Sequence, residues 1–319
     1  MAKISVVVAA VAGQGGGMTT SMLPTRADVT AAARRIRPYA RRTPLMDVAP
    51  DGRPVVFKLE HLQLTGSFKI RGALNALLSE PAPDLVVTAS GGNHGLAVAT
   101  AARLLGLPAV VYVPESVPAG KARRIEAQGA RLVRHGARYA DAAEAALAAA
   151  TGPGARYLPA YDEAAVLAGQ GTLAAEVVAD RPDVDVLVVA VGGGGLAGGS
   201  VVGADGRTVV AVEPEHCRCL HDAIAAGEPV DVEIDSVAAS ALGATRVGAL
   251  PFELLRNSPS VLVSDAELLA ARDRLWEEFR LAVEPAAAAP MAALLAGRVP
   301  GELPCVVLCG ANTDWTPNA

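Results

Sequence analysis

Short apolar runs alternate along this chain with longer stretches in which apolar positions recur at helical spacing. The runs predict strands at 55–60, 85–89, 109–113, 131–134, 184–191, 209–212 and 305–308. Helical spacing covers 96–105, 119–128, 140–150, 163–179, 216–226, 265–279 and 285–296, and another helix is expected to begin at Ser67. Apolar strands that alternate with helices are typical of βαβ units, so the pattern predicts an α/β protein with parallel sheets.

The composition agrees with this fold class. The 319 residues are 51% hydrophobic but only 3% aromatic, and they include 32 glycines. Alanine, valine and leucine therefore supply most of the apolar surface, which suits closely packed helices and strands. No internal repeat and no long linker interrupt the pattern. A chain of this length can form one or two domains, which we expect to be intimately joined.

The charge pattern limits the choice of partners. The net charge is −5 without a block of like charges, so nucleic acid is not an expected partner. No stretch reaches the roughly 18 apolar residues that span a bilayer, so no membrane segment is expected. Residues 1–22 are expected to be a disordered N-terminal extension or a misplaced start. Four cysteines in a chain of this size do not suggest a disulfide framework, and we expect a cytoplasmic location.

Glycine-rich turns follow three of the predicted strands, and each is expected to precede a helix. They are Ser90-Gly91-Gly92-Asn93-His94-Gly95, the run Gly192 to Gly195, and Cys309-Gly310-Ala311-Asn312. Ligands of open α/β sheets bind where strands end, and helix N-termini there attract anions. Four consecutive glycines suit an isolated phosphate, and the first turn suits a substrate carboxylate. The alternatives are a flexible turn, an ordinary helix cap and, for Cys309, a buried apolar side chain.

Lys69 is the strongest candidate for covalent chemistry. Only four of the 28 basic residues are lysines, namely Lys3, Lys58, Lys69 and Lys121. A buried ammonium can lose its proton and become a nucleophile, whereas a guanidinium cannot. A neutral lysine amine forms a Schiff base with a carbonyl group such as that of pyridoxal phosphate. The alternative is a lysine that only covers the start of a helix.

Four motifs in this order resemble the serine/threonine dehydratase family. They are Ser-Phe-Lys-Ile-Arg-Gly-Ala from Ser67, Ser-Gly-Gly-Asn-His-Gly, the four glycines and Cys-Gly-Ala-Asn. The resemblance covers about residues 25–314. It implies a fold-type II pyridoxal-phosphate enzyme, similar to tryptophan synthase β, with the cofactor between two open parallel-sheet α/β domains. We expect a large domain formed by 23–83 and 164–319 and a small domain formed by 84–163.

The resemblance also implies roles for individual residues. Lys69 would hold pyridoxal 5′-phosphate as a Schiff base and later act as the base at Cα, with Phe68 against the ring. Asn93 would bind the 3′ oxygen, Cys309 would face the ring nitrogen, and Glu284 would lie near the ring. The phosphate would be bound by the N–H groups of Gly192, Gly193, Gly194, Gly195 and Leu196. The substrate carboxylate would be bound by Ser90, Gly91, Asn93 and His94.

The resemblance implies elimination of water from L-serine or L-threonine, which gives pyruvate or 2-oxobutyrate and ammonia. It also implies a homodimer. Serine racemases have a second serine where this chain has Gly91, so one-sided elimination is favoured. The alternatives are hydroxyaspartate dehydration, racemisation, β-replacement and a silent protein that binds the cofactor or an amino acid.

We expect no metal. Glu213 matches the first acid of the family's divalent-cation site, but the later acidic ligand falls near Cys219. The cluster His216-Cys217-Arg218-Cys219-Leu220-His221 would place Cys217 and His221 on one helix face. Its spacing nevertheless differs from that of structural zinc sites.

Overall fold

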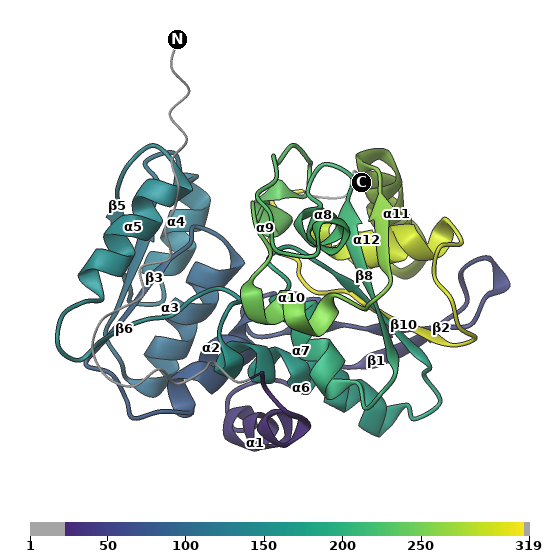
Figure 1. Cartoon of the computed structure of the whole chain (residues 1–319), viewed down its shortest axis with the longest axis horizontal. Helices are drawn as coiled ribbons and strands as arrows, with labels where there is room; N and C mark the ends of the chain where they lie inside the picture. Colours follow the sequence, from purple (N-terminus) through teal and green to yellow (C-terminus); the bar gives the residue numbers. More distant parts are fainter. Residues whose placement is uncertain (1–22, 316–319) are drawn as a thin grey trace, which may run out of the picture.

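A computed structural model describes residues 23–315, and the expected extension 1–22 lies outside these residues. Their strands form two separate sheets (Figure 1). The six-stranded sheet has the order β1-β2-β10-β7-β8-β9, and the four-stranded sheet has the order β5-β4-β3-β6. Helices flank both sheets, as in the α/β class that the sequence predicts.

The six-stranded sheet is parallel except at one edge. Its strands are β1 (Leu45–Val48), β2 (Val55–Lys58), β7 (Val186–Ala190), β8 (Thr208–Pro214), β9 (Ser260–Val263) and β10 (Pro304–Val307). Only β1 pairs antiparallel, with Leu45 opposite Lys58. The connection from β1 to β2 is too short for the crossover that a parallel pair requires, so the chain makes a hairpin there.

The four-stranded sheet is wholly parallel. Its strands are β3 (Leu85–Ala89), β4 (Ala109–Val113), β5 (Arg131–Arg134) and β6 (Ala155–Tyr157). The chain connects them through α3 (Asn93–Leu105), α4 (Ala119–Glu126) and α5 (Tyr139–Ala149). The first three strands have the bounds that the apolar runs predict. Strand β6 was not predicted, because three half-buried residues at a sheet edge make no apolar run.

The remaining helices surround the six-stranded sheet or join the two sheets. They are α1 (Arg26–Ile36), α2 (Lys69–Leu78), α6 (Ala164–Asp180), α7 (Gly195–Gly203), α8 (Cys219–Ala226), α9 (Ala239–Leu242), α10 (Ala249–Leu255), α11 (Asp265–Phe279) and α12 (Pro285–Leu295). None of the helices between residues 23 and 315 is both long enough and apolar enough to cross a membrane.

Helix α6 packs against α2 and α7 with almost no space between the backbones. A Cβ atom added to Gly171 would lie 2.5 Å from the carbonyl oxygen of Gly199, and one added to Gly203 would lie 2.2 Å from that of Gly171. On the other side, a Cβ atom on Gly169 would lie 2.6 Å from the carbonyl oxygen of Arg71. Helices α2, α6 and α7 therefore form one closely packed unit at the centre of the molecule (Figure 1).

Candidate active site

The four glycines form the turn between β7 and α7. Gly194 occupies the N-cap of α7 with a φ of 89°, a left-handed conformation that favours glycine. A Cβ atom on Gly193 would lie 2.3 Å from the ring of Tyr161, so that ring packs directly on the turn. Within residues 23–315, the N–H groups from Gly193 to Leu196 have no acceptor. Free N–H groups at a helix N-terminus fit a phosphate.

Lys69 is the first residue of α2, and the residue as a whole is half-buried. Its Nζ donates a hydrogen bond to the carbonyl oxygen of Ala160 at 2.9 Å. The next residue, Tyr161, is the one that packs on the glycine turn, so one short segment contacts both groups. Burial lowers the pKa of Lys69 to about 8, although Cys309 and Glu284 act in the opposite direction. The amine is therefore much more easily deprotonated than an ordinary lysine.

Cys309 lies beside Phe68, at the end of β10. The N–H of Phe68 donates to the carbonyl oxygen of Cys309 at 3.1 Å, and Ser67 forms an antiparallel bridge with Gly310. Burial raises the pKa of the Cys309 thiol, which therefore stays neutral. The expectation of a helix after this turn is wrong, because the chain runs without one to residue 315. Its backbone pairs instead with the segment before α2.

A chain of hydrogen bonds holds the amide of Asn93. Its Nδ2 donates to Oε1 of Glu284 at 2.8 Å, and its Oδ1 accepts from Nδ2 of Asn312 at 2.7 Å. Asn312 also donates to the carbonyl oxygen of Thr65 at 2.7 Å. Glu284 fits here only because residue 310 is glycine, since a Cβ atom there would lie 2.2 Å from Oε1. Burial raises the pKa of Glu284 to about 7.

The turn from Ser90 to His94 leads into α3. The helix begins at Asn93 with Gly92 as its N-cap, earlier than the predicted start at residue 96, because polar and glycine residues occupy its first turn. The Ser90 hydroxyl does not cap the helix but accepts from the N–H of Gly92 at 3.2 Å. His94 is buried, and its Nε2–H donates to the carbonyl oxygen of Leu158 at 3.0 Å. Burial and the nearby Lys69 lower the pKa of His94 to about 3, so the ring is neutral.

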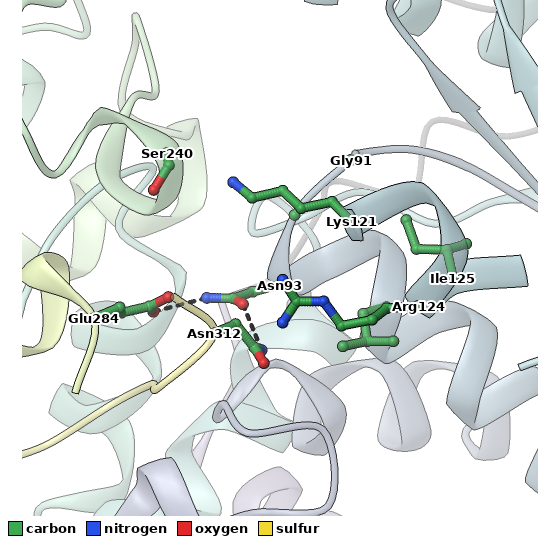
Figure 2. Close-up of a pocket in the computed structure, with 10 residues that line it drawn as sticks. Gly91, Asn93, Lys121, Arg124, Ile125, Ser240, Glu284 and Asn312 are labelled. Atoms are coloured by element: carbon green, nitrogen blue, oxygen red, sulfur yellow. Dashed lines mark hydrogen bonds between the residues drawn. The ribbon is translucent and has the colours of Figure 1, made fainter. Parts of the chain in front are cut away.

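Several of these residues line one pocket between the two sheets (Figure 2). Gly91 and Asn93 come from the turn at the start of α3, whereas Glu284 and Asn312 come from the segments before α12 and after β10. Figure 2 shows the hydrogen bonds that join Asn93 to Glu284 and to Asn312. Four polar side chains without a role predicted from the sequence also line this pocket, namely Lys121, Arg124, Ser240 and Asn312. Asn312 belongs to the Cys-Gly-Ala-Asn motif, although no role of its own was predicted for it. No local pattern indicated that Lys121, Arg124 or Ser240 would reach the site.

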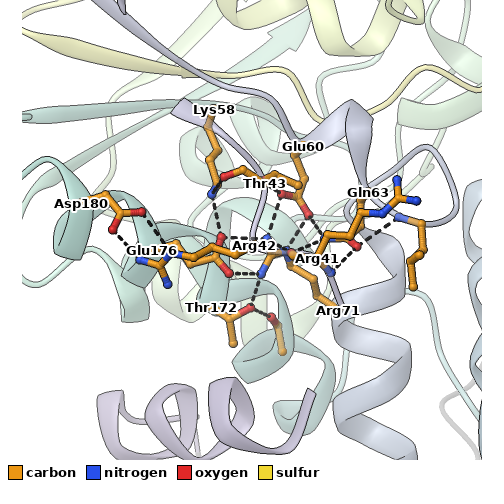
Figure 3. A network of polar contacts seen from close by, with 12 residues as sticks. Arg41, Arg42, Thr43, Lys58, Glu60, Gln63, Arg71, Thr172, Glu176 and Asp180 are labelled. Carbon is orange, nitrogen blue, oxygen red and sulfur yellow. Dashed lines mark hydrogen bonds and ion pairs between the residues drawn. The ribbon is translucent and has the colours of Figure 1, made fainter. Parts of the chain in front are cut away.

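Arg71 connects α2 to a buried ion network (Figure 3). It pairs with Glu60 at 2.5 Å and with Glu176 at 2.7 Å, and Lys58 pairs with Glu176 at 2.6 Å. The side chains of Lys58 and Glu60 are fully buried, and that of Arg71 is only 1% exposed. This network fixes the helix that begins with Lys69 against β2 and α6.

The carboxylate of Glu213 is engaged by the backbone at the start of α8. Both carboxylate oxygens of Glu213 accept backbone N–H groups at the start of α8, from Leu220 at 2.9 Å and His221 at 2.8 Å. The prediction that Cys217 and His221 share a helix face is wrong, because α8 begins at Cys219. Between residues 23 and 315 no three metal-ligating side chains gather. The four cysteines are buried and free.

Comparisons with known proteins agree with this geometry. Residues 36–310 match the model of a family described as pyridoxal-phosphate dependent enzyme. An L-threonine ammonia-lyase of Geobacter sulfurreducens is 38% identical over 88% of this chain and 73% of its own length. An L-threo-3-hydroxyaspartate ammonia-lyase of Saccharomyces cerevisiae is 33% identical over 92% of this chain and 94% of its own length.

A solved structure has the same fold. The crystal structure of a threonine deaminase from T.th. is 34% identical, with a TM-score of 0.87 over 92% of this chain and all of the other. The free N–H groups of the glycine turn fit the phosphate of the family's cofactor, and the amine of Lys69 fits its aldehyde. The chain therefore belongs to the pyridoxal-phosphate-dependent enzymes of fold-type II, and pyridoxal 5′-phosphate is its cofactor.

Proposed function

We propose that this enzyme eliminates water from L-serine and L-threonine and releases a 2-oxo acid and ammonia. The observation that carries the proposal is the position of the Lys69 amine, which is hydrogen-bonded to the segment that packs on the glycine turn. Burial lowers the pKa of this amine to about 8. The ammonia-lyase names of the two relatives support the same reaction class.

Pyridoxal phosphate would be held covalently by Lys69 and electrostatically by the N–H groups from Gly192 to Leu196. When bound, it supplies an electron sink that stabilises negative charge at the substrate Cα. Phe68 would lie against its ring, and Cys309 would face the ring nitrogen. A neutral thiol does not force a proton onto that nitrogen, as a carboxylate would.

The protein side chains would then divide the remaining tasks. The loop from Ser90 to His94 would bind the substrate carboxylate at the start of α3. The Asn93 amide is already oriented by Glu284 and Asn312, so it would need no rearrangement to bind the cofactor. Lys69 would take the proton from Cα and pass a proton to the hydroxyl oxygen on Cβ, so that the bond from Cβ to this oxygen breaks and the oxygen leaves as water.

We also propose that 84–163 closes as a small domain on a large domain formed by 23–83 and 164–319. The pocket supports this, because residues of α3 and α4 in the range 84–163 line it together with Glu284 and Asn312 from the range 164–319. Helix α2 would act as the contact between the domains, since its Ile70 packs in one apolar cluster with Val86 of β3. Closure would exclude water from the reaction. A homodimer, proposed from the family resemblance, is tested by light scattering after size-exclusion chromatography.

A second substrate is favoured by a specific observation. The Saccharomyces cerevisiae relative is named for L-threo-3-hydroxyaspartate, and the pocket contains two cationic side chains that serine and threonine do not require. Racemisation is disfavoured, since a Cβ atom on Gly91 would lie 2.6 Å from Cγ2 of Val117. A serine hydroxyl in that place would need Val117 to move.

The test replaces Lys69 by alanine and, as a matched control of charge, by arginine. Both variants should bind no cofactor covalently, so they should show neither the visible absorbance of bound pyridoxal phosphate nor a borohydride-stable label at position 69. Release of 2-oxo acid from L-serine and L-threonine should be abolished in both. Unaltered turnover in either variant would contradict the proposal, and a labelled wild type that converts no amino acid would indicate a silent binding protein.

A further inference from the structure

Lys121 and Arg124 place two positive charges at the active-site pocket. They lie one turn apart on α4, and Figure 2 shows the Lys121 ammonium directed toward Ser240 and the Arg124 guanidinium directed toward Asn93 and Asn312. Both side chains come from α4 and line the pocket that also contains Glu284. Neither is among the residues expected to bind the cofactor or the substrate α-carboxylate.

These charges are poorly compensated by the rest of the described chain. Within residues 23–315, Lys121 has no ion-pair partner, and Arg124 has only a 3.5 Å contact with Asp314, whose side chain is 84% exposed. An exposed ion pair of that length contributes little. Glu284 is the one acidic side chain among the described residues that line the pocket, and burial raises its pKa to about 7 although the charge of Lys121 acts in the opposite direction. Even a fully ionised Glu284 would balance only one of the two cations on α4, so these side chains leave an excess of positive charge.

An uncompensated cation becomes unfavourable when a bound substrate and a closing domain remove water from it. A substrate with a single carboxylate, bound at the turn from Ser90 to His94, would leave this excess in place. A second carboxylate one carbon farther from Cα would neutralise it and could accept the planar pair of N–H donors of Arg124.

We propose that Lys121 and Arg124 bind the β-carboxylate of a 3-hydroxylated dicarboxylic amino acid, so that the enzyme prefers 3-hydroxyaspartate over serine and threonine. This inference rests on the proposed elimination and specifies its substrate class. Loss of the 3-hydroxyl as water, followed by hydrolysis, converts 3-hydroxyaspartate into oxaloacetate and ammonia. The second carboxylate stays in the product and acts only in binding.

The first test compares kcat/KM for 3-hydroxyaspartate, as separate threo and erythro isomers, with kcat/KM for L-serine in the loaded enzyme. Arg124→Leu should lower the ratio of the two values about 10- to 100-fold, mainly through KM, because a hydrogen bond between charged groups is lost. Lys121→Met should act in the same direction. Arg123→Leu is the matched control, since this arginine is exposed on the same helix and does not line the pocket. It should leave the ratio unchanged.

The second test measures binding without turnover. Malonate, titrated into the holoenzyme and followed by calorimetry, should bind more tightly than acetate and should lose that advantage in Arg124→Leu but not in Arg123→Leu. An equal loss for L-serine and 3-hydroxyaspartate in Arg124→Leu would overturn the inference, because Arg124 would then bind the α-carboxylate. Equal malonate affinity in all three proteins would also overturn it. If no amino acid is converted, the elimination fails, while the malonate result still decides the role of Arg124.

Discussion

Replacing Glu284 by glutamine should stabilise the cofactor-free protein at high pH. Burial raises the pKa of this carboxyl from 4.5 to about 7, and the side chain is only 4% exposed. A carboxyl that holds its proton more tightly in the folded state makes the free energy of unfolding fall as the pH rises from 4.5 to about 7. That interval of about 2.5 pH units, at 1.36 kcal/mol per unit, corresponds to roughly 3 kcal/mol.

Glutamine has no charge to bury and keeps an oxygen that can accept from Nδ2 of Asn93. The Glu284→Gln variant should therefore exceed the wild type in free energy of unfolding by up to about 3 kcal/mol at pH 8 and match it near pH 4. Urea denaturation of the cofactor-free proteins across this range measures the difference.

Glu267 provides a control with the opposite sign. Its pKa is lowered, first by a side-chain hydrogen bond with Arg298, so its contribution to stability is present above its ordinary pKa and is lost as the pH falls. Glu267→Gln should therefore destabilise the protein at pH 8 and have little effect near pH 4. A gain from Glu284→Gln that is the same at both pH values, or larger at pH 4, would refute the reasoning.

Three further predictions concern the site and its support. Gly91→Ser should destabilise the protein by about 1–3 kcal/mol in urea denaturation, and Val117→Ala in the same chain should recover much of this loss, because the added Cβ meets Val117 at 2.6 Å. Arg71→Met should cost about 3–5 kcal/mol in the same assay, since it leaves the buried carboxylate of Glu60 without its ion-pair partner, whereas Arg42→Met at an exposed ion pair should cost about 1 kcal/mol or less. The rate at which cofactor-free protein captures pyridoxal phosphate, followed by absorbance, should rise with pH through a midpoint near 8, because only neutral Lys69 is nucleophilic.

The parts of the fold that the sequence predicts well have strong local patterns. Strands β3 and β4 are apolar runs bounded by turn residues, and their predicted bounds match the structure. The bounds of β5 also match, although only Leu132 and Val133 of its four residues are apolar. A helix was expected after the glycine turn, but its bounds could not be predicted. The sequence of α7, Gly-Leu-Ala-Gly-Gly-Ser-Val-Val-Gly, has poor helix propensity. Packing against α6 holds it in place, and no local pattern reports such packing.

The same distinction applies to the active site. Lys69, Asn93 and the glycine turn each belong to a compact motif that can be read in a few residues. Ser240 and Arg124 belong to no such motif and reach the pocket from α9 and α4, so only the tertiary fold brings them together. Motifs thus indicated the class of chemistry, whereas the residues that we propose select the substrate required the structure.

The close glycine contacts of α6 determine which positions of this enzyme can be substituted to change its substrate specificity. Because α6 touches both α2 and α7 without room for a β-carbon, the lysine and the phosphate-binding turn are held at a constant separation. The side chains on α4 have no comparable restriction. A directed-evolution library for new substrates should therefore randomise positions 121 and 124 and leave Gly169, Gly171 and Gly199 untouched, because larger residues at those glycines would separate the lysine from the turn before any new specificity could arise.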